Sequence, residues 1–314
     1  MVNRPRSVQA QAAGLMLAST LCFGVMAICI RLASRTEPTF EIAFFRNFFG
    51  LLSLLPILLL PVLRSPTPRK TLDGIVRTRQ LPRYFTRCLI GVASMFCGFW
   101  AIGHLPLSQA ISLAYSSPIF VTIAAVFLLG EKVRMRRWMA VAAGFIGMLV
   151  IVRPGSQAFS PGLLVAVAAA VLSAIVAIQI KQLSKVDGPD TIVLWTYLFW
   201  VPMSLLPALA VWHWPEGEAW LWLVLCGVFG TGGQWLWTRA LKLGELSALT
   251  PISFMQLPIV TLAGWWLFDE SVDRWTMIGA GIILSATAYI AHRETQLSKR
   301  KATHAPSEAV EPGN

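Results

Sequence analysis

The hydrophobic and polar positions of this 314-residue chain alternate in long blocks rather than residue by residue. Most windows of about 20 residues between the short polar breaks are apolar, and a helix of that length crosses a hydrocarbon core of roughly 30 Å. The pattern predicts ten membrane-spanning helices, at residues 12–32, 40–63, 84–103, 107–129, 138–153, 161–183, 191–212, 219–241, 247–268 and 275–292.

Composition supports an all-α integral membrane protein. The chain is 56% hydrophobic and 13% charged, with a mean hydropathy of +0.64, which excludes an ordinary soluble domain. The first apolar run follows basic residues, as in a signal peptide. It exceeds 20 residues and lacks a small-residue cleavage pattern, so we interpret it as a retained first span.

The second half of the chain repeats short sequences of the first half in the same order. Residues 27–31 return as 177–181, 53–56 as 204–207, 107–108 as 246–247, 128–133 as 267–272, and 137–144 as 274–281. The repeats are predicted to occupy residues 1–153 and 154–292, followed by a disordered cytoplasmic tail at 293–314. Each repeat holds five spans, an odd number, so the second must enter the membrane inverted. Duplicated units of this kind are mostly transporters.

The distribution of basic residues agrees with inverted repeats. With the N-terminus in the cytoplasm, 21 of the 26 lysines and arginines lie inside, four lie outside and Arg46 lies within a span. The loop 131–137 is basic and inside, whereas its equivalent 269–274 carries three acids and is outside. Both termini are therefore predicted to be cytoplasmic. The basic run from Arg69 to Arg87 is interpreted as a loop facing anionic lipid, so the net charge of +11 needs no nucleic-acid partner.

Motifs of soluble chemistry are missing from the sequence. There is no Walker A sequence and no Gly-x-Ser-x-Gly elbow, and the four histidines lack the paired spacing of a metal site. The five cysteines fall within the spans without ligand spacing. We expect no catalytic residue, cofactor or metal, and an intramembrane enzyme is the least favoured class.

Two blocks carry a resemblance to a known family. Pro118 precedes an apolar run that ends at Leu129-Gly130-Glu131, and Pro258 precedes one that ends at Asp269-Glu270; Phe44-Phe45-Arg46 also fits. Over residues 12–292 the chain resembles the drug/metabolite transporter superfamily, specifically its ten-span EamA-type members. The resemblance implies two inverted five-span bundles around a central cavity, secondary transport and a bacterial inner-membrane location. Asp269 stands where the family usually has glycine, so this turn is expected to be capped differently.

Arg46 is the strongest single candidate for a substrate-binding residue. It lies about 12 Å past Pro38 along a helix, near the membrane midplane. An arginine there costs roughly 2.5–3.5 kcal/mol, so it must face protein or water. It either binds substrate or bonds structurally to helix carbonyls. Its counterpart at the repeat offset of 151 is Tyr197.

Several other polar or aromatic residues lie inside the predicted spans. The amides of Gln179, Gln234 and Gln256 need partners in an apolar medium. Tyr115 and Ser116 precede Pro118 as Gln256 precedes Pro258, and we predict that these two segments form opposite walls of one site. Trp100 is deep enough to stack on a flat solute, with lipid contact or packing as the alternative. The full set of predicted substrate-binding residues is Arg46, Trp100, Tyr115, Ser116, Gln179, Tyr197, Gln234 and Gln256.

The sequence therefore predicts a secondary transporter of a small organic metabolite, such as an amino acid or a vitamin, working by alternating access. The alternative is a lipid or lipid-carrier translocator of the same fold. Expected partners are the small-molecule substrate, membrane lipids and a coupling proton or ion; the sequence does not assign an oligomeric state. Glu131 and Glu270 are expected to tie short turns to neighbouring lysine or arginine, with proton coupling as the alternative.

Cysteine labelling tests the inverted topology. In a background without native cysteines, a reagent that cannot cross membranes should label Met135→Cys only from the cytoplasm and Asp273→Cys only from outside. The two positions lie in equivalent loops of the two repeats, and the loop is basic in the first repeat but carries three acids in the second. Labelling of both positions from one side would contradict the odd number of spans per repeat.

Overall fold

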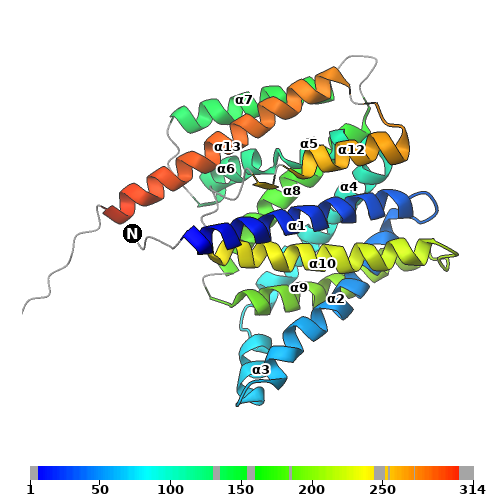
Figure 1. Ribbon diagram of the computed structural model, residues 1–314, viewed down its shortest axis with the longest axis vertical. Coiled ribbons are helices and arrows are strands. Elements are labelled where there is room, and N and C mark those ends of the chain that lie inside the picture. The colour runs from blue at the N-terminus through cyan, green and yellow to red at the C-terminus, as the bar shows by residue number, and fades with distance from the viewer. Residues whose placement is uncertain are drawn as a thin grey trace, which may run out of the picture.

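The structure is a computed structural model that describes residues 6–129, 135–153, 160–183, 186–243, 252–253, 255–271 and 273–303. Its helices are α1 (Arg6–Ala33), α2 (Thr39–Leu63), α3 (Pro68–Val76), α4 (Leu81–His104), α5 (Leu107–Ala114), α6 (Ser117–Leu129), α7 (Met135–Val152), α8 (Gly162–Leu183), α9 (Pro189–Leu209), α10 (Ala219–Leu243), α12 (Gln256–Phe268) and α13 (Arg274–Thr303). They lie roughly side by side (Figure 1).

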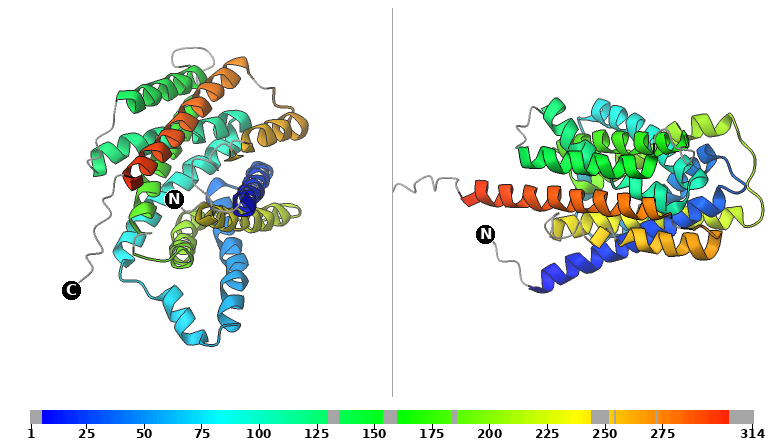
Figure 2. Two further views of the ribbon diagram at one scale, coloured as in Figure 1. Left: turned by 60° about the vertical axis from the view of Figure 1, so that its left-hand side comes forward. Right: turned by 90° about the horizontal axis from the view of Figure 1, so that it is seen from above.

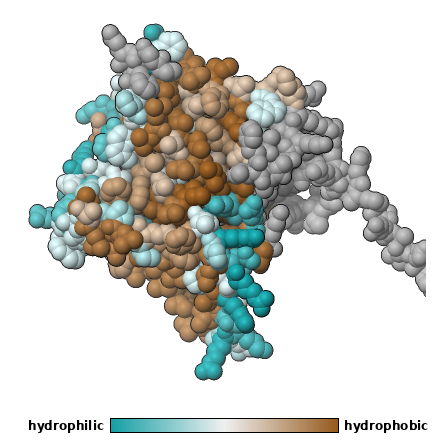
Figure 3. Space-filling model, turned by 180° about the vertical axis from the view of Figure 1, so that it is seen from behind, coloured by the Kyte–Doolittle hydropathy of each residue, from teal (hydrophilic) through white to brown (hydrophobic). Residues whose placement is uncertain are grey.

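Most of the predicted spans correspond to these helices within a few residues, whereas α12 begins at Gln256, within the predicted span 247–268, whose first residues lie outside the described part of the chain. Seven helical segments are long and apolar enough to cross a membrane, and shorter apolar helices cover Trp138–Val152 and Gln256–Phe268. Much of the surface seen in Figure 3 is apolar. Trp266 is 79% exposed and Leu206 73% exposed, which is the exposure expected of side chains that face lipid.

The fourth span is broken in the middle. Helix α5 ends at Ala114, and α6 begins at Ser117 with Pro118 in its first turn. Proline lacks the N–H that an unbroken helix would use there, but it is tolerated at the start of a helix. Pro258 occupies the first turn of α12 in the same way, so the two repeats share this device.

Two further features differ from the sequence-based prediction: the end of the last helix and an additional short helix. Helix α13 continues to Thr303, so residues 293–303 are helical, which corrects the prediction of a disordered tail from 293. The segment 294–302 is rich in glutamate, glutamine, lysine and arginine, which are good helix formers even without an apolar face. The second difference is α3, an extra helix between the second and third spans.

The packing of the helices follows the two repeats. Helix α1 packs along α10, and its repeat equivalent α8 packs along α4. Helix α2 packs against its own equivalent α9, α7 against α13, and α5 against α12. Exchanging the repeats maps the α1–α10 contact onto the α8–α4 contact and leaves the α2–α9 and α7–α13 contacts in place, as a pseudo-two-fold axis requires. The start of α1 and the end of α13 lie on one side of the molecule, here called the terminal face (Figure 2).

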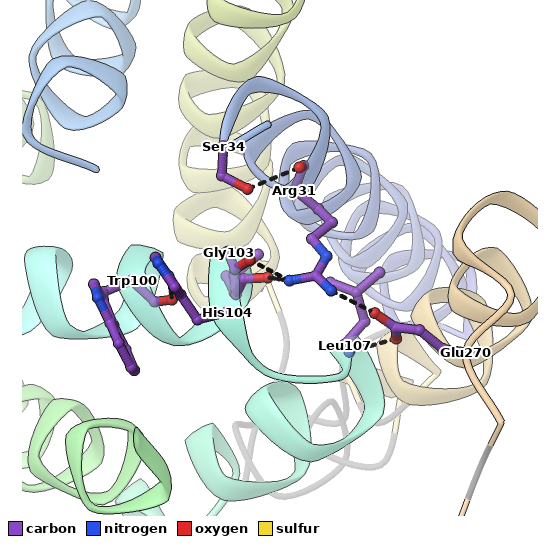
Figure 4. Close-up of polar contacts among 8 residues, drawn as sticks. Arg31, Ser34, Trp100, Gly103, His104, Leu107 and Glu270 are labelled. Atoms are coloured by element: carbon purple, nitrogen blue, oxygen red, sulfur yellow. Dashed lines mark hydrogen bonds and ion pairs between the residues drawn. The ribbon is translucent and has the colours of Figure 1, made fainter. Parts of the chain in front are cut away.

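An ion pair joins four segments on the opposite face (Figure 4). The Arg31 Nη2 group lies 3.0 Å from Glu270 Oε1, and Nη1 donates to the last carbonyls of α4 at Ile102 and Gly103. Glu270 Oε2 accepts the Leu107 N–H at the start of α5, at 2.8 Å. The expectation that Glu270 ties a turn to a basic residue agrees with this contact. Its equivalent Glu131 lies outside the described residues.

Asp269 forms the turn before Glu270. It adopts φ 52° and ψ 29°, the left-handed conformation in which glycine commonly ends a helix. The Glu270 N–H then bonds to the Gly264 carbonyl at 3.0 Å. The cap is therefore the one that glycine would make, which corrects the expectation of a different cap at this position.

The Arg31–Glu270 contact should contribute measurably to stability. Glu270→Gln removes a charge-assisted contact whose side chains are mostly buried, and should lower the free energy of unfolding by about 1.5–3 kcal/mol. Asp73→Asn is the matched control, because the Arg77–Asp73 pair is exposed and should change stability by less than about 0.5 kcal/mol. Thermal or denaturant unfolding of the purified variants measures both. Equal effects of the two substitutions would contradict this role.

Candidate substrate-binding site between the repeats

Arg46 is buried where helices of both repeats meet. The residue lies on α2 and is only 6% exposed. Its guanidinium carbon lies 5.5 Å from the ring centroids of both Tyr197 and Trp200 on α9. Nη1 donates to Asn47 Oδ1 at 3.0 Å, whereas the buried Nε has no hydrogen-bond partner.

Glycine lets α10 approach Arg46. A Cβ added at Gly230 would lie 2.8 Å from Met26 Sδ, closer than real Cβ atoms come, and 3.0 Å from Arg46 Nε, a very tight contact. Glycine at this position thus serves close helix packing. It also leaves room for the guanidinium group of Arg46.

Arg87 is a second buried cation in the same region. It lies on α4, is 5% exposed and donates to Thr196 Oγ1. Its guanidinium carbon is 5.7 Å from the Trp200 ring centroid, and its Nε has no hydrogen-bond partner. The interpretation of residues 69–87 as a lipid-facing loop is therefore wrong for Arg87. Helix α4 begins at Leu81, so Arg87 lies about 9 Å along it, within the bundle.

The two arginines share one aromatic ring and have no acidic partner there. Among the described residues, no ion pair includes Arg46 or Arg87. Cation–π contact with Trp200 compensates part of the burial cost. The Trp200 Nε1 atom is itself buried without a hydrogen-bond partner. Three unpaired donors around one indole make this region suited to a flat molecule with hydrogen-bond acceptors or a negative charge.

Hydrogen bonds between helices fix the frame around the arginines. Asn47 Nδ2 donates to Ser204 Oγ at 3.1 Å, which joins α2 to α9. The Tyr197 hydroxyl and Thr231 Oγ1 lie 2.7 Å apart, which joins α9 to α10. Gly50 fits against the second pair, since a Cβ there would lie 2.7 Å from atoms of both side chains.

A pocket of about 430 Å³ leads from the terminal face toward this cluster. It is lined by residues of α1, α2, α9 and α10: Gln11, Leu15, Leu54, Leu58, Asp190, Val193, Trp235, Arg239 and Leu243. Its volume suits a small metabolite. Leu54 and Leu58 also pack against Tyr197, and Thr231 lies one turn beyond Trp235 on α10. The Tyr197–Thr231 pair therefore lies between the pocket and Arg46.

The structure brings together some of the predicted site residues. Arg46 and Tyr197, which occupy matched positions in the repeats, are in contact. Tyr115 and Gln256 also meet: the Tyr115 hydroxyl donates to the Ser253 carbonyl and lies 3.2 Å from Gln256 Oε1. The two pre-proline segments thus contact each other, and their role as opposite walls of one site stays a prediction.

The other predicted residues lie elsewhere. Trp100 stacks on His104, with ring centroids 4.3 Å apart, and Ser116 Oγ donates to the Leu113 carbonyl at 2.6 Å. Gln179 lines a separate pocket of about 470 Å³ that also includes Arg83. Gln234 is half-buried on α10, between Thr231 and the pocket residue Trp235.

Sequence reasoning missed three residues of the cluster: Asn47, Arg87 and Trp200. Arg87 could have been identified from the sequence, because the predicted span 84–103 contains it. An arginine within a span must face protein or water, as was argued for Arg46. Trp200 was not among the predicted residues; it lies 11 residues into α9, between the two arginines. Asn47 had no sequence signal beyond its place next to Arg46.

Comparison with known proteins identifies the family. The EamA-like transporter family matches residues 11–153 and again 160–291. A riboflavin transporter of Vibrio cholerae is 34% identical over 78% of this chain and 82% of its own length. A riboflavin transporter of Rhizobium johnstonii is 29% identical over 84% of this chain and 85% of its own length. An S-adenosylmethionine uptake transporter of Rickettsia felis is 30% identical over 84% of this chain and 86% of its own length.

A solved structure supports the fold. It superposes with a TM-score of 0.61 at 20% identity, over 93% of this chain and 99% of that one, which is a likeness of fold alone. The all-α fold of ten membrane helices in two inverted repeats is confirmed. The relatives are transporters and not enzymes. The chain therefore belongs to the EamA-like transporter family, within the drug/metabolite transporter superfamily, and is a multi-pass membrane transporter of a small organic metabolite.

Proposed function

We propose that the chain carries riboflavin, or a metabolite with a similarly flat heteroaromatic ring, and binds it at Arg46, Trp200 and Arg87. The observation that carries this proposal is the pair of buried guanidinium groups around one indole, with no acidic partner among the described residues. The names of the relatives point the same way, because riboflavin and S-adenosylmethionine both contain a flat heteroaromatic ring.

The chemistry of the cluster matches such a ring. The indole of Trp200 and the phenol of Tyr197 offer faces for stacking, which favours a flat body over an aliphatic one. The free Nε groups of Arg46 and Arg87 would donate to ring carbonyl oxygens, or to the carboxylate of a charged substrate. Riboflavin presents carbonyl oxygens at one end of its ring system, and S-adenosylmethionine presents a carboxylate.

The access route follows from the two faces of the molecule. The pocket opens at the terminal face, where Gln11, Asp190 and Arg239 are exposed. The opposite face is tied by Arg31 and Glu270. With both termini in the cytoplasm of the bacterial inner membrane, as the distribution of basic residues favours, this conformation faces inward. The repeats 1–153 and 154–292 would then rock against each other to open the opposite face. A lipid translocator is not favoured, because the named relatives move water-soluble metabolites.

Uptake into vesicles tests the substrate class. Proteoliposomes that contain the purified protein should accumulate riboflavin with saturable kinetics, and unlabelled riboflavin should compete. S-adenosylmethionine is tested in parallel. If it alone is transported, the carboxylate and not the ring carbonyls is the group that the arginines recognise. Absence of saturable flux for both compounds would contradict the proposal.

Substitution of Arg46 tests the site. Arg46→Lys keeps the positive charge but loses the planar guanidinium, so equilibrium binding of the transported substrate should weaken about 10- to 100-fold, which corresponds to about 1.5–3 kcal/mol. Arg64→Lys is the control, because Arg64 is exposed at the end of α2 and its replacement should leave binding unchanged.

The structural alternative for Arg46 makes a different prediction. If Arg46 only supports the fold, Arg46→Lys should lower protein yield and melting temperature while binding per folded molecule stays unchanged. That outcome would remove Arg46 from the site.

A further inference from the structure

His213 lies between two buried carboxylates on the face away from the termini. Glu37 lies in the corner between α1 and α2, Glu41 lies in the first turn of α2, and His213 lies in the connection from α9 to α10. His213 Nε2 is 2.9 Å from Glu37 Oε2, and Nδ1 is 3.1 Å from Glu41 Oε1. The cluster thus joins the first repeat to the second, and it is separate from the arginine cluster.

The backbone fixes the position of the histidine. The His213 N–H donates to Glu41 Oε1 at 3.0 Å, the same oxygen that faces Nδ1. A proton on Nδ1 would therefore point at this carboxylate, and Nε2 would carry its lone pair.

The free ring nitrogen then faces an oxygen atom. An unprotonated Nε2 would lie 2.9 Å from Glu37 Oε2, an arrangement that is repulsive unless both atoms bind a common cation; a protonated Nε2 would instead donate a hydrogen bond to this oxygen. Ligand atoms of Glu37, Glu41 and His213 lie within 4.8 Å of one another, close enough to share one ion.

One carboxylate oxygen in the cluster is also unsatisfied. The side chain of Glu41 is completely buried, yet its Oε2 has no hydrogen-bond partner. Two ionised carboxylates with a neutral histidine carry a charge of −2, which a divalent cation would neutralise. An imidazolium at His213 would leave a buried negative charge uncompensated.

We propose that Glu37, Glu41 and His213 bind a divalent transition-metal ion on the face opposite the termini. One imidazole nitrogen and two carboxylates form a ligand set that suits Zn²⁺ and similar ions. His213 is 46% exposed, so the ion reaches the site from solvent and has room for a water ligand. A bound ion would hold the α9–α10 connection against the α1–α2 corner and so favour closure of this face. Such closure would make transport sensitive to the metal.

Calorimetry with zinc tests the site. The full-length protein, stripped of metal with a chelator and dialysed, is titrated with ZnCl₂ at pH 7.5. Wild type should bind one ion, and His213→Asn and Glu41→Gln should each weaken binding by at least tenfold. His213→Asn changes an exposed connection, so it keeps the test interpretable if the buried Glu41→Gln variant folds poorly. His104→Asn is the matched control, because this histidine stacks on Trp100 and should not affect the affinity.

The pH dependence separates a metal ion from a proton. Metal binding needs a neutral histidine, so zinc affinity should rise from pH 6 to pH 7.5. An imidazolium that bridges the two carboxylates has the opposite pH dependence, because its stabilisation weakens as the pH rises. Desolvation lowers the pKa of His213, but the charges of Glu41 and Glu37 outweigh it and raise the pKa above its ordinary value. Stabilisation by an imidazolium would therefore be present at acid pH and be lost as the pH rises through that pKa.

Two results would overturn the proposal. The first is zinc binding that is equally strong in wild type and in His213→Asn. The second is the absence of zinc binding to wild type, together with a melting temperature that depends on His213 only at acid pH. The second result would assign the cluster to an imidazolium bridge.

Discussion

A charged guanidinium group is expensive to bury in an apolar bundle, and this fold buries two of them around one indole. Arg46 comes from the first repeat on α2, Arg87 from the same repeat on α4, and Trp200 from the second repeat on α9. The surrounding structure serves this arrangement: Gly230 admits the Arg46 side chain, Asn47 and Ser204 join α2 to α9, and Tyr197 and Thr231 join α9 to α10. The burial of two arginines at such cost, without an acidic partner among the described residues, supports the proposed binding role.

Inverted duplication explains why this cluster lies where it can be opened from either side. The contacts of one repeat are made largely with the other, so relative movement of the repeats changes access to residues held between them. The two faces are closed by different means. On the face opposite the termini, Arg31 and Glu270 join the ends of α1 and α4 to the start of α5. On the terminal face, the pocket reaches inward as far as the residues that pack on Tyr197.

Much of the fold was predictable from sequence because the membrane imposes length and polarity on each span. The ten apolar segments and the inversion of the second repeat follow from local composition and order. The break of the predicted span 107–129 between Ala114 and Ser117 was not predicted, and neither was the contact between Arg46 and its repeat counterpart Tyr197. The carboxyl end of the chain was less predictable, because the polar residues that continue α13 to Thr303 carry no hydrophobic period.

Contacts between distant segments could not be predicted. His213 meets Glu41 across 172 positions, and neither residue has a sequence neighbour that indicates the other. Arg87 and Trp200 were assigned from their proximity to span ends, whereas their contacts depend on how α4 and α9 pack. Gln179, Ser116 and Trp100 lie apart from the arginine cluster, and their part in the substrate site stays a prediction. Gln179 lines a separate pocket, Ser116 donates to the Leu113 carbonyl, and Trp100 stacks on His104.

The central claim is that the transported molecule binds between the arginines and the indole. An experimental structure of the protein with riboflavin bound in a lipid nanodisc tests this most directly. The account predicts density for the ring system against Trp200, with polar atoms of the ligand within hydrogen-bond distance of Arg46 or Arg87. Ligand density confined to the pocket that contains Gln179, or to the contact between Tyr115 and Gln256, with both arginines unchanged, would contradict it.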